Sequence, residues 1–489
     1  MANKPNVVVL MADEMRFDCL SCYGDLGVRT PHMDALANES VVFDRAYCAS
    51  PLCVPARTAI AAGKWPHRTG VIVNGSHSEL ERPFSVLGPE HRTYLEQLED
   101  AGYRIAHVGV QHMKGLPQRL TGARFVGERE YVDYLNKKGL KPAADDSARR
   151  PCPDFVNGKM IVKGYYPATF VRKTEFGADD FMDVYWSRVM CESIREADLS
   201  QPNAWIFNGW APHPPAFVPE PYFSMYDPEA IRLPANVAQW YAGQPPFLLH
   251  TTSAKGVQLK ADDWRKMWAA YFGLVTMVDD CMGRVIAALK ERGVWDDALV
   301  IFTMDHGECL GAHSLWAKQV MYEESARIPL MIKPPGGRTG RRTQIANQVD
   351  LAATICEYAG VEAPAGHQGR SLKAAVENAA AAWHEATFAD YHGEQGRGYP
   401  SRAIFTERYK YIFHFCGPDE LYDVIADPLE TKSLATEPEF QPLKHELRGH
   451  LAQWMRETGD VFDMERDANF TPQNWPEVGL RFSRPREVI

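Results

Sequence analysis

The chain has 489 residues, of which 45% are hydrophobic and 24% are charged, and its formal net charge is −10. This length favours a large domain with a smaller second one, and the acidic balance disfavours nucleic acids and anionic membranes as partners. The ten cysteines are too dispersed for a disulfide framework. Neither a secretory signal nor an apolar run of bilayer length is evident, so we expect a cytoplasmic protein.

Short apolar runs alternate with helical patterns over the first 300 residues. Strands are predicted at "NVVVLMADE", "VVFDRAYC", "YRIAHVGV", "AWIFNGWAPH" and "ALVIFTM". Helices are predicted at "PHMDALANES", "RTYLEQLED", the segment that starts "DWRKMWAAYF", and "RTAIAAG", which Gly63 would close. Apolar runs of this kind are typical of buried parallel strands, and their alternation with helices predicts an α/β fold with a mainly parallel sheet.

Two regions depart from this alternation. Residues 116–190 mix Pro, Gly and charge with little periodicity, which favours an irregular insertion beside the site, where substrate choice is often set. Beyond about residue 380, "SRAIFTERYKYIFHF" alternates like a hairpin and "EFQPLKHELRGHLAQWMRETGD" has a helical pattern. We therefore predict a catalytic domain at 1–380, and a small α+β subdomain with a tail at 381–489.

Four of the predicted strands end in side chains that can carry chemistry. They are Asp13, His112, His213 and the pair Asp305–His306. Singly, each acid could be a helix cap or a surface charge, and each histidine a loop or core residue. Because ligands bind beyond the carboxyl ends of parallel strands, their coincidence predicts one site. With Glu14 beside Asp13, the set is rich in oxygen and suits Ca²⁺, Mg²⁺ or Mn²⁺ better than structural zinc.

A single cysteine, Cys53, precedes Pro55 and Arg57 in the stretch "CVPAR". One interpretation is a thiol nucleophile that Arg57 activates. Another is a buried structural cysteine, which is the usual role of a lone Cys.

The stretch "CVPAR" resembles the Cys-x-Pro-x-Arg signature of type I sulfatases, in the alkaline phosphatase superfamily. The resemblance continues in order through "PNVVVLMADEMRFDC", "YRIAHVGVQH", "APHPPAFVPEPYF", "VIFTMDHGECLGAHSLWAKQVMYEESARIPLMI" and "DELYDVIADPLETKSLA". It implies an alkaline-phosphatase-like fold, with a large, mainly parallel or mixed sheet sandwiched by helices. It also implies that a formylglycine-generating enzyme, a transient partner, converts Cys53 to formylglycine.

The resemblance implies a cation site. Asp13, Asp305 and His306 would bind one divalent cation together with an oxygen of the modified Cys53. Ca²⁺ is the expected ion, with Mn²⁺ and Mg²⁺ as alternatives. Glu14 stands where many relatives have a second Asp, and whether its longer side chain reaches the ion is left open.

The resemblance also implies catalytic roles. One hydroxyl of the formylglycine hydrate would attack sulfur, and collapse of the intermediate would expel sulfate. Arg57 would hold the hydrate, and His112 would be the base for the collapse. His213 and Lys318 would bind the non-bridging oxygens and supply a proton to the leaving alcohol. His313, in the same block as Lys318, has no assigned role.

The chain departs from the family pattern at three places. Most sulfatases have a Lys where Val110 stands, and Lys114 could replace it only if the backbone bends it inward. The metal block has Asp-His in place of Asp-Asn, a variant that occurs in sulfatases of choline and uronate esters and in phosphonate monoester hydrolases. Ala56 stands where Ser is commoner, which leaves Cys-x-Pro-x-Arg intact.

The leading hypothesis is a sulfatase that hydrolyses a sulfate monoester of a small molecule or sugar. A phosphonate monoester or phosphodiester hydrolase is the alternative, and because those esters are also monoanions, the missing lysine does not separate them. A non-catalytic relative that keeps the Cys53 thiol is a third hypothesis. The alcohol is not predicted, and a homo-oligomer is left open. Four aromatic residues could stack on a sugar or aryl group of the substrate or belong to the core: Trp186, Trp205, Trp210 and Tyr222.

Overall fold

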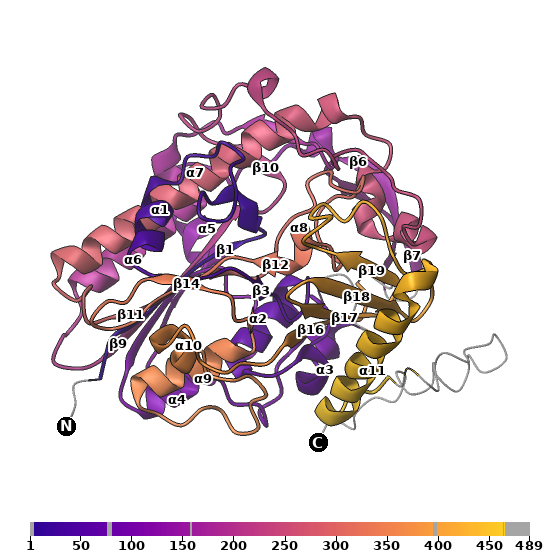
Figure 1. The fold of residues 1–489 in the computed structure, drawn as a ribbon. Helices are drawn as coiled ribbons and strands as arrows, with labels where there is room; N and C mark the ends of the chain where they lie inside the picture. Colours follow the sequence, from indigo (N-terminus) through magenta and orange to yellow (C-terminus); the bar gives the residue numbers. More distant parts are fainter. Residues whose placement is uncertain (1–3, 76–80, 157–158, 395–398, 463, 465–489) are drawn as a thin grey trace.

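The computed structural model describes residues 4–75, 81–156, 159–394, 399–462 and 464 (Figure 1). Its centre is an eight-stranded sheet. The strands are β1 Val7–Asp13, β2 Val41–Phe43, β4 Arg104–Gly109, β5 Arg124–Val126, β9 Asn203–Pro212, β11 Leu299–Met304, β13 Leu330–Lys333 and β14 Gly340–Arg342.

The strand order is β14-β2-β13-β11-β1-β9-β4-β5. From β11 to β5 every neighbouring pair is parallel, and β13 is antiparallel to both of its neighbours. The sheet confirms the predicted mainly parallel or mixed architecture. Strands β1 and β11 are buried along their whole length, which explains their continuous apolar sequences "VVVLMAD" and "LVIFTM".

Helices cover both faces of the sheet (Figure 1). On one face lie α1 Pro31–Asn38, α5 Glu128–Lys137, α6 Met182–Arg195 and α7 Ala261–Glu291. On the other lie α2 Cys53–Ala62, α3 Pro66–Thr69, α4 Tyr94–Asp100, α9 Asp350–Ala359 and α10 Lys373–Glu377. The short helix α8 spans Glu323–Ala326. Among the described residues, no helix has both the length and the apolar character that a bilayer crossing requires.

The stretch "VVFDRAYC", predicted as one strand, forms two. β2 belongs to the large sheet, whereas β3 Ala46–Tyr47 pairs with β12 Arg327–Ile328 and β15 Ala346–Asn347. The chain leaves the large sheet at Asp44, whose carboxylate accepts a hydrogen bond from Arg341 Nε at 2.6 Å. Because this arginine lies about 300 residues further along the chain, no local pattern marks the break.

Residues 116–190 are more regular than their composition predicts. They hold β5 and α5, and also β6 Arg150–Val156, β7 Lys159–Tyr165 and β8 Val171–Lys173, which pairs with β10 Ala216–Val218. Aromatic contacts between distant residues order part of this segment. The rings of Tyr134 and Tyr185 stack with centroids 4.6 Å apart, and Trp186 Nε1 donates to the Gly127 carbonyl at 3.2 Å.

The C-terminal part forms the predicted small α+β subdomain. Strands β16 Ala386–Tyr391, β17 Ser401–Thr406, β18 Tyr409–His414 and β19 Glu420–Asp423 make an antiparallel sheet, and α11 Gln441–Thr458 packs on it (Figure 1). Trp454 of α11 stacks on Phe388 and meets Trp65 edge-on at 5.1 Å, so the subdomain shares an apolar core with the α2–α3 region. The proposed boundary at 380 falls between α10 and β16, and the tail after residue 464 lies outside the described residues.

Candidate active site

The four strands with polar ends are consecutive in the sheet, in the order β11, β1, β9 and β4. Asp13 is the last residue of β1, His213 follows β9, and Asp305–His306 follow β11. His112 comes three residues after β4. Because all four strands are parallel, these side chains meet at one edge of the sheet, as the sequence pattern predicts.

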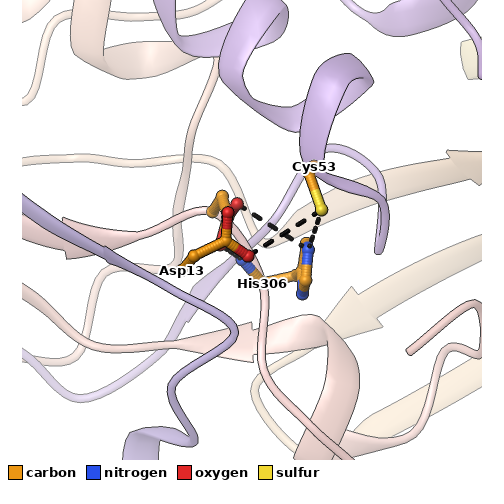
Figure 2. A group of neighbouring side chains, drawn as sticks. Asp13, Cys53 and His306 are labelled. Carbon is orange, nitrogen blue, oxygen red and sulfur yellow. Dashed lines mark hydrogen bonds and ion pairs between the residues drawn. The ribbon is translucent and has the colours of Figure 1, made fainter. Parts of the chain in front are cut away.

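Three of these side chains lie around Cys53: Asp13, Asp305 and His306. Asp13 and His306 point toward its sulfur, which hangs from the start of helix α2 (Figure 2). Cys53 Sγ lies 3.1 Å from His306 Nε2 and 3.8 Å from Asp13 Oδ1. His306 Nδ1 donates to the Gly307 carbonyl at 2.9 Å, so Nε2 is left as the free acceptor that faces the sulfur.

The donor atoms of Asp13, Cys53, Asp305 and His306 all lie within 4.8 Å of one another, and all four residues are buried. Two carboxylates and one imidazole nitrogen form a donor set that fits a divalent cation. The oxygen-rich composition predicted from the sequence is therefore present as a compact group.

Arg57 fixes the two carboxylates of this group. Its Nη2 donates to Asp13 Oδ2 and its Nε to Asp305 Oδ2, both at 2.9 Å, and the three side chains are at most 1% exposed. Burial alone would raise the pKa of Asp13, but Arg57 and Lys318 outweigh it and hold that pKa below its ordinary value. Asp13 is therefore kept ionised inside the protein.

Cys53 is the first residue of α2, and Gly63 ends the helix in the left-handed region with φ 64°, as the sequence predicts. Every residue of α2 is buried. Burial raises the pKa of the Cys53 thiol well above its usual range, and the nearby Asp13 adds to the effect. This environment weighs against a simple thiolate nucleophile.

Lys318 joins Glu14 and His213 beside the first group. Its Nζ donates to Glu14 Oε2 at 2.6 Å and to His213 Nε2 at 3.0 Å. His213 Nδ1 donates to the Pro214 carbonyl at 2.5 Å, which leaves Nε2 as an acceptor. Burial and the Lys318 ammonium lower the pKa of His213 to about 3, so the ring is neutral at ordinary pH.

His112 completes the site from the end of β4. Its Nδ1 lies 3.8 Å from Asp13 Oδ2, and burial together with Arg57 lowers its pKa to about 4. His112 and His213 are the more exposed side chains, at 33% and 21%, against 8% for Lys318. The two histidines therefore lie on the solvent-exposed side of the site.

Comparison with known proteins decides the family. The family model described as "Sulfatase" matches residues 5–361. The chain belongs to the sulfatase family. A second model, described as "N-sulphoglucosamine sulphohydrolase, C-terminal", matches residues 311–457. The "Ulvan-active sulfatase" of Formosa agariphila is 28% identical over 94% of this chain and 82% of its own. This sulfatase is therefore a sulfuric ester hydrolase.

Solved structures agree with the fold. A protein in complex with its substrate D-glucosamine-2-N,6-O-disulfate is 23% identical and gives a TM-score of 0.75, over 96% of this sulfatase and 100% of that chain. The phosphonate monoester hydrolase of Agrobacterium radiobacter is 24% identical with a TM-score of 0.76, over 93% and 96% of the two chains. Both likenesses confirm the expected architecture.

The structure does not support Lys114 as the replacement for the lysine missing at Val110. Lys114 forms a bridge with Val86, and its Nζ donates to the carbonyls of Asn74 and Gly75 at 3.0 and 3.2 Å. Pairing with distant backbone thus directs the side chain to another loop. Asn74 Oδ1 in turn accepts from the N–H of Val54 at 3.0 Å, so this loop supports the start of α2. Sequence patterns gave no signal for Asn74.

His313 lies outside this site. Its ring stacks on Tyr322 with centroids 4.0 Å apart, and its Nε2 is 3.8 Å from Glu324. Glu430, from the C-terminal subdomain, completes that buried group and is paired with the ammonium of Lys410.

The four aromatic residues singled out in the sequence have different roles in the structure. Trp186 and Trp205 are at most 2% exposed and belong to the core, and the hydroxyl of the buried Tyr222 donates to Asp280 at 2.6 Å. Trp210 differs, because its half-buried ring lies beside His213 and His112.

Proposed function

We propose that this sulfatase hydrolyses the sulfate monoester of a small molecule or carbohydrate, with formylglycine made from Cys53 and one divalent cation. Ca²⁺ is the proposed ion, with Mn²⁺ and Mg²⁺ as alternatives. The observation that carries the proposal is the gathering of three cation-binding side chains around Cys53, beside Lys318 and His213.

The proposed groups have distinct tasks. A cation held by Asp13, Asp305 and His306 would supply positive charge to the sulfate oxygens, and a formylglycine hydrate at position 53 would supply the nucleophilic hydroxyl. Arg57 orients the two carboxylates through its hydrogen bonds.

Lys318 and His213 are proposed to bind the sulfate oxygens and to protonate the leaving alcohol. Lys318 has three N–H donors and gives one to Glu14 and one to His213, which leaves the third for a sulfate oxygen. Nε2 of His213 carries no proton in this arrangement, so it must accept a proton before it can donate one to the alcohol. Lys318 already directs an N–H group at this atom. Since Glu14 Oε2 binds Lys318, only the other oxygen of Glu14 would be available to a cation.

His112 is proposed as the base for collapse of the intermediate. Because its lowered pKa keeps the ring neutral near pH 7, it can accept a proton there. Its partial exposure lets the proton pass on to solvent.

A phosphonate monoester or phosphodiester hydrolase is the second candidate. One observation favours it: a phosphonate monoester hydrolase shares the fold. Sulfate monoesters and these phosphorus esters each carry one negative charge, so the electrostatics of the site does not separate them.

The test compares kcat/KM for 4-nitrophenyl sulfate and 4-nitrophenyl phenylphosphonate, with Ca²⁺ and then with Mn²⁺. A large preference for the sulfate, lost in Cys53→Ala, supports the proposal. A preference for the phosphonate would overturn it in favour of the second candidate. Mass spectrometry of the peptide that holds residue 53 tests the modification, and a wholly unmodified thiol in an inactive protein would favour a non-catalytic relative.

The proposal also includes a transient partner, the enzyme that oxidises Cys53. A cytoplasmic location and the absence of nucleic-acid and membrane partners stay predictions from the sequence, which leaves the oligomeric state open.

A further inference from the structure

Strand β9 loses its register with β1 just before the active site. Met11 pairs with Asn208, but Asp13 pairs with Pro212, so residues 209–211 form a bulge opposite a single residue of β1. A bulge of this kind re-aims the side chains that it carries. Here it carries Trp210.

The bulge is held in place by Asp183, a fully buried residue of α6. Its Oδ1 accepts hydrogen bonds from the N–H groups of Trp210 and Ala211 at 2.7 and 3.1 Å. A Cβ atom at Gly209 would lie 2.9 Å from the same oxygen, so glycine allows this close approach. The backbone that positions Trp210 is therefore held by a residue of helix α6.

The indole of Trp210 is a neighbour of both histidines of the site. Its ring centroid is 4.3 Å from that of His213, with the planes at 38°, and 6.1 Å from that of His112, with the planes at 80°. The ring is half-buried, and both histidines are partly exposed. Trp210 thus belongs to the exposed edge of the site and not to its interior.

This position determines what the indole can touch. An ester attacked at residue 53 places its sulfate toward Lys318 and the buried acids Asp13 and Asp305, which are closed to solvent. The alcohol must stay on the exposed side, with its bridging oxygen near the proton donor His213. The group attached to that oxygen then lies against the ring next to His213.

We propose that Trp210 determines which alcohols the enzyme accepts, by stacking on a leaving group that has a flat apolar face. An aryl ring and the CH face of a sugar ring both offer such a face, whereas a short alkyl chain does not. The inference rests on the proposed function, because it places the ester relative to residue 53 and His213.

The test measures kcat/KM of Trp210→Leu and Trp210→Phe, each divided by that of the wild type, for 4-nitrophenyl sulfate, glucose 6-sulfate and ethyl sulfate. The ratio cancels the different intrinsic reactivities of the three esters. We expect Trp210→Leu to lose about tenfold on an ester with a flat leaving group and less than about twofold on ethyl sulfate. Trp210→Phe keeps a flat ring and should lose less. If the larger loss is on the aryl ester, Trp210 stacks on an aryl leaving group. If it is on the sugar ester, Trp210 stacks on a sugar ring.

Trp240→Leu is the matched control, because it removes an indole that is 37% exposed on another loop. Thermal melts of all variants check folding, and Trp210→Phe carries the test if Trp210→Leu fails to fold. An equal loss on all three esters, with a shifted pH profile, would mean that Trp210 only positions the histidines, and would overturn the proposal. Ratios of variant to wild-type kcat/KM that stay close to one for all three esters would overturn the proposal too.

Failure of the proposed function can be told apart from failure of this inference. A wild-type enzyme that cleaves 4-nitrophenyl phenylphosphonate but no sulfate would refute the proposed function. The same ratios, measured for aryl and ethyl esters of phenylphosphonate, would still test Trp210.

Discussion

The active site has two halves that are held in different ways. The acid half consists of Asp13, Arg57, Asp305 and His306 around residue 53, and its side chains are at most 1% exposed. The histidine half consists of His112, His213 and Lys318, with exposures of 33%, 21% and 8%.

The acid half holds fixed charges, whereas the histidine half is suited to proton transfer. In the acid half, Arg57 pairs with both carboxylates, so its charges are part of the folded core. In the histidine half, both imidazoles are neutral and partly open to solvent, which suits proton transfer. A substitution in the acid half should therefore reduce stability and activity together, and a substitution of either histidine in the other half should reduce activity alone.

The largest effect is expected at the residue that both halves share. Cys53→Ala removes the proposed nucleophile, and kcat/KM for 4-nitrophenyl sulfate should fall by at least about 10⁴-fold. The melting temperature should stay close to that of the wild type, because a small buried side chain is exchanged for a smaller one. Activity within tenfold of the wild type would contradict the assignment.

Asp305→Asn tests the acid half. It removes one of the two carboxylates that neutralise Arg57 and one proposed cation ligand. Breaking a buried ion pair costs about 3–5 kcal/mol, so urea unfolding should show a loss of that size. Turnover and Ca²⁺ binding by calorimetry should fall together, and a variant as stable as the wild type would show that the acid half is not a structural unit.

His213→Gln tests the histidine half. Loss of a positioned proton donor should lower kcat/KM by about 10²-fold. Stability should change little, since the side chain is partly exposed and the amide oxygen of glutamine can accept the hydrogen bond of Lys318. A stability loss as large as that of Asp305→Asn would remove the distinction between the halves.

His107 on β4 shows what burial does to a histidine outside both halves. It accepts a hydrogen bond from Asn208 Nδ2 at 3.1 Å, and burial, followed by the Arg57 charge, lowers its pKa from 6.5 to about 3. Below pH 6.5 the unfolded chain takes up a proton that the folded chain does not, so stability falls as the pH drops. From pH 7 to pH 5 this residue should contribute a loss of about 2 kcal/mol.

Urea unfolding of the wild type and His107→Gln at both pH values isolates this contribution. The difference between the two proteins in unfolding free energy should change by the predicted amount. A difference that is the same at pH 7 and pH 5 would mean that His107 does not stay neutral in the folded state.

The smallest effect is expected for Lys114→Ala. Its exposed ammonium binds the backbone of the loop at Asn74 and Gly75 and belongs to neither half, so kcat/KM should change by less than about threefold. A hundredfold loss in kcat would instead place Lys114 among the groups that bind sulfate.

The sequence predicted the features that depend on local pattern. The polar ends of β1, β9 and β11 are visible as apolar runs that stop at Asp13, His213 and Asp305, and the rule for parallel sheets brings such ends together. Gly63 marks the end of α2 because only a short stretch decides a helix cap.

Features fixed by distant contacts were not predictable. The break at Asp44 depends on Arg341, the direction of Lys114 depends on its pairing with Val86, and the place of Trp210 depends on Asp183 of another element. In each case the deciding partner is close in space but far along the chain, and no periodicity carries that information.

The burial of α2 has a consequence for the order of events in biosynthesis. Cys53 lies inside the finished protein, and its neighbours Asp305 and His306 follow β11, so at about 5–20 residues per second the ribosome needs roughly 13–50 s to make the intervening 250 or so residues. Any enzyme that oxidises Cys53 must act before these residues close over it. The fraction of active molecules would then depend on the rate of modification relative to the rate of folding, and slowed translation would increase this fraction.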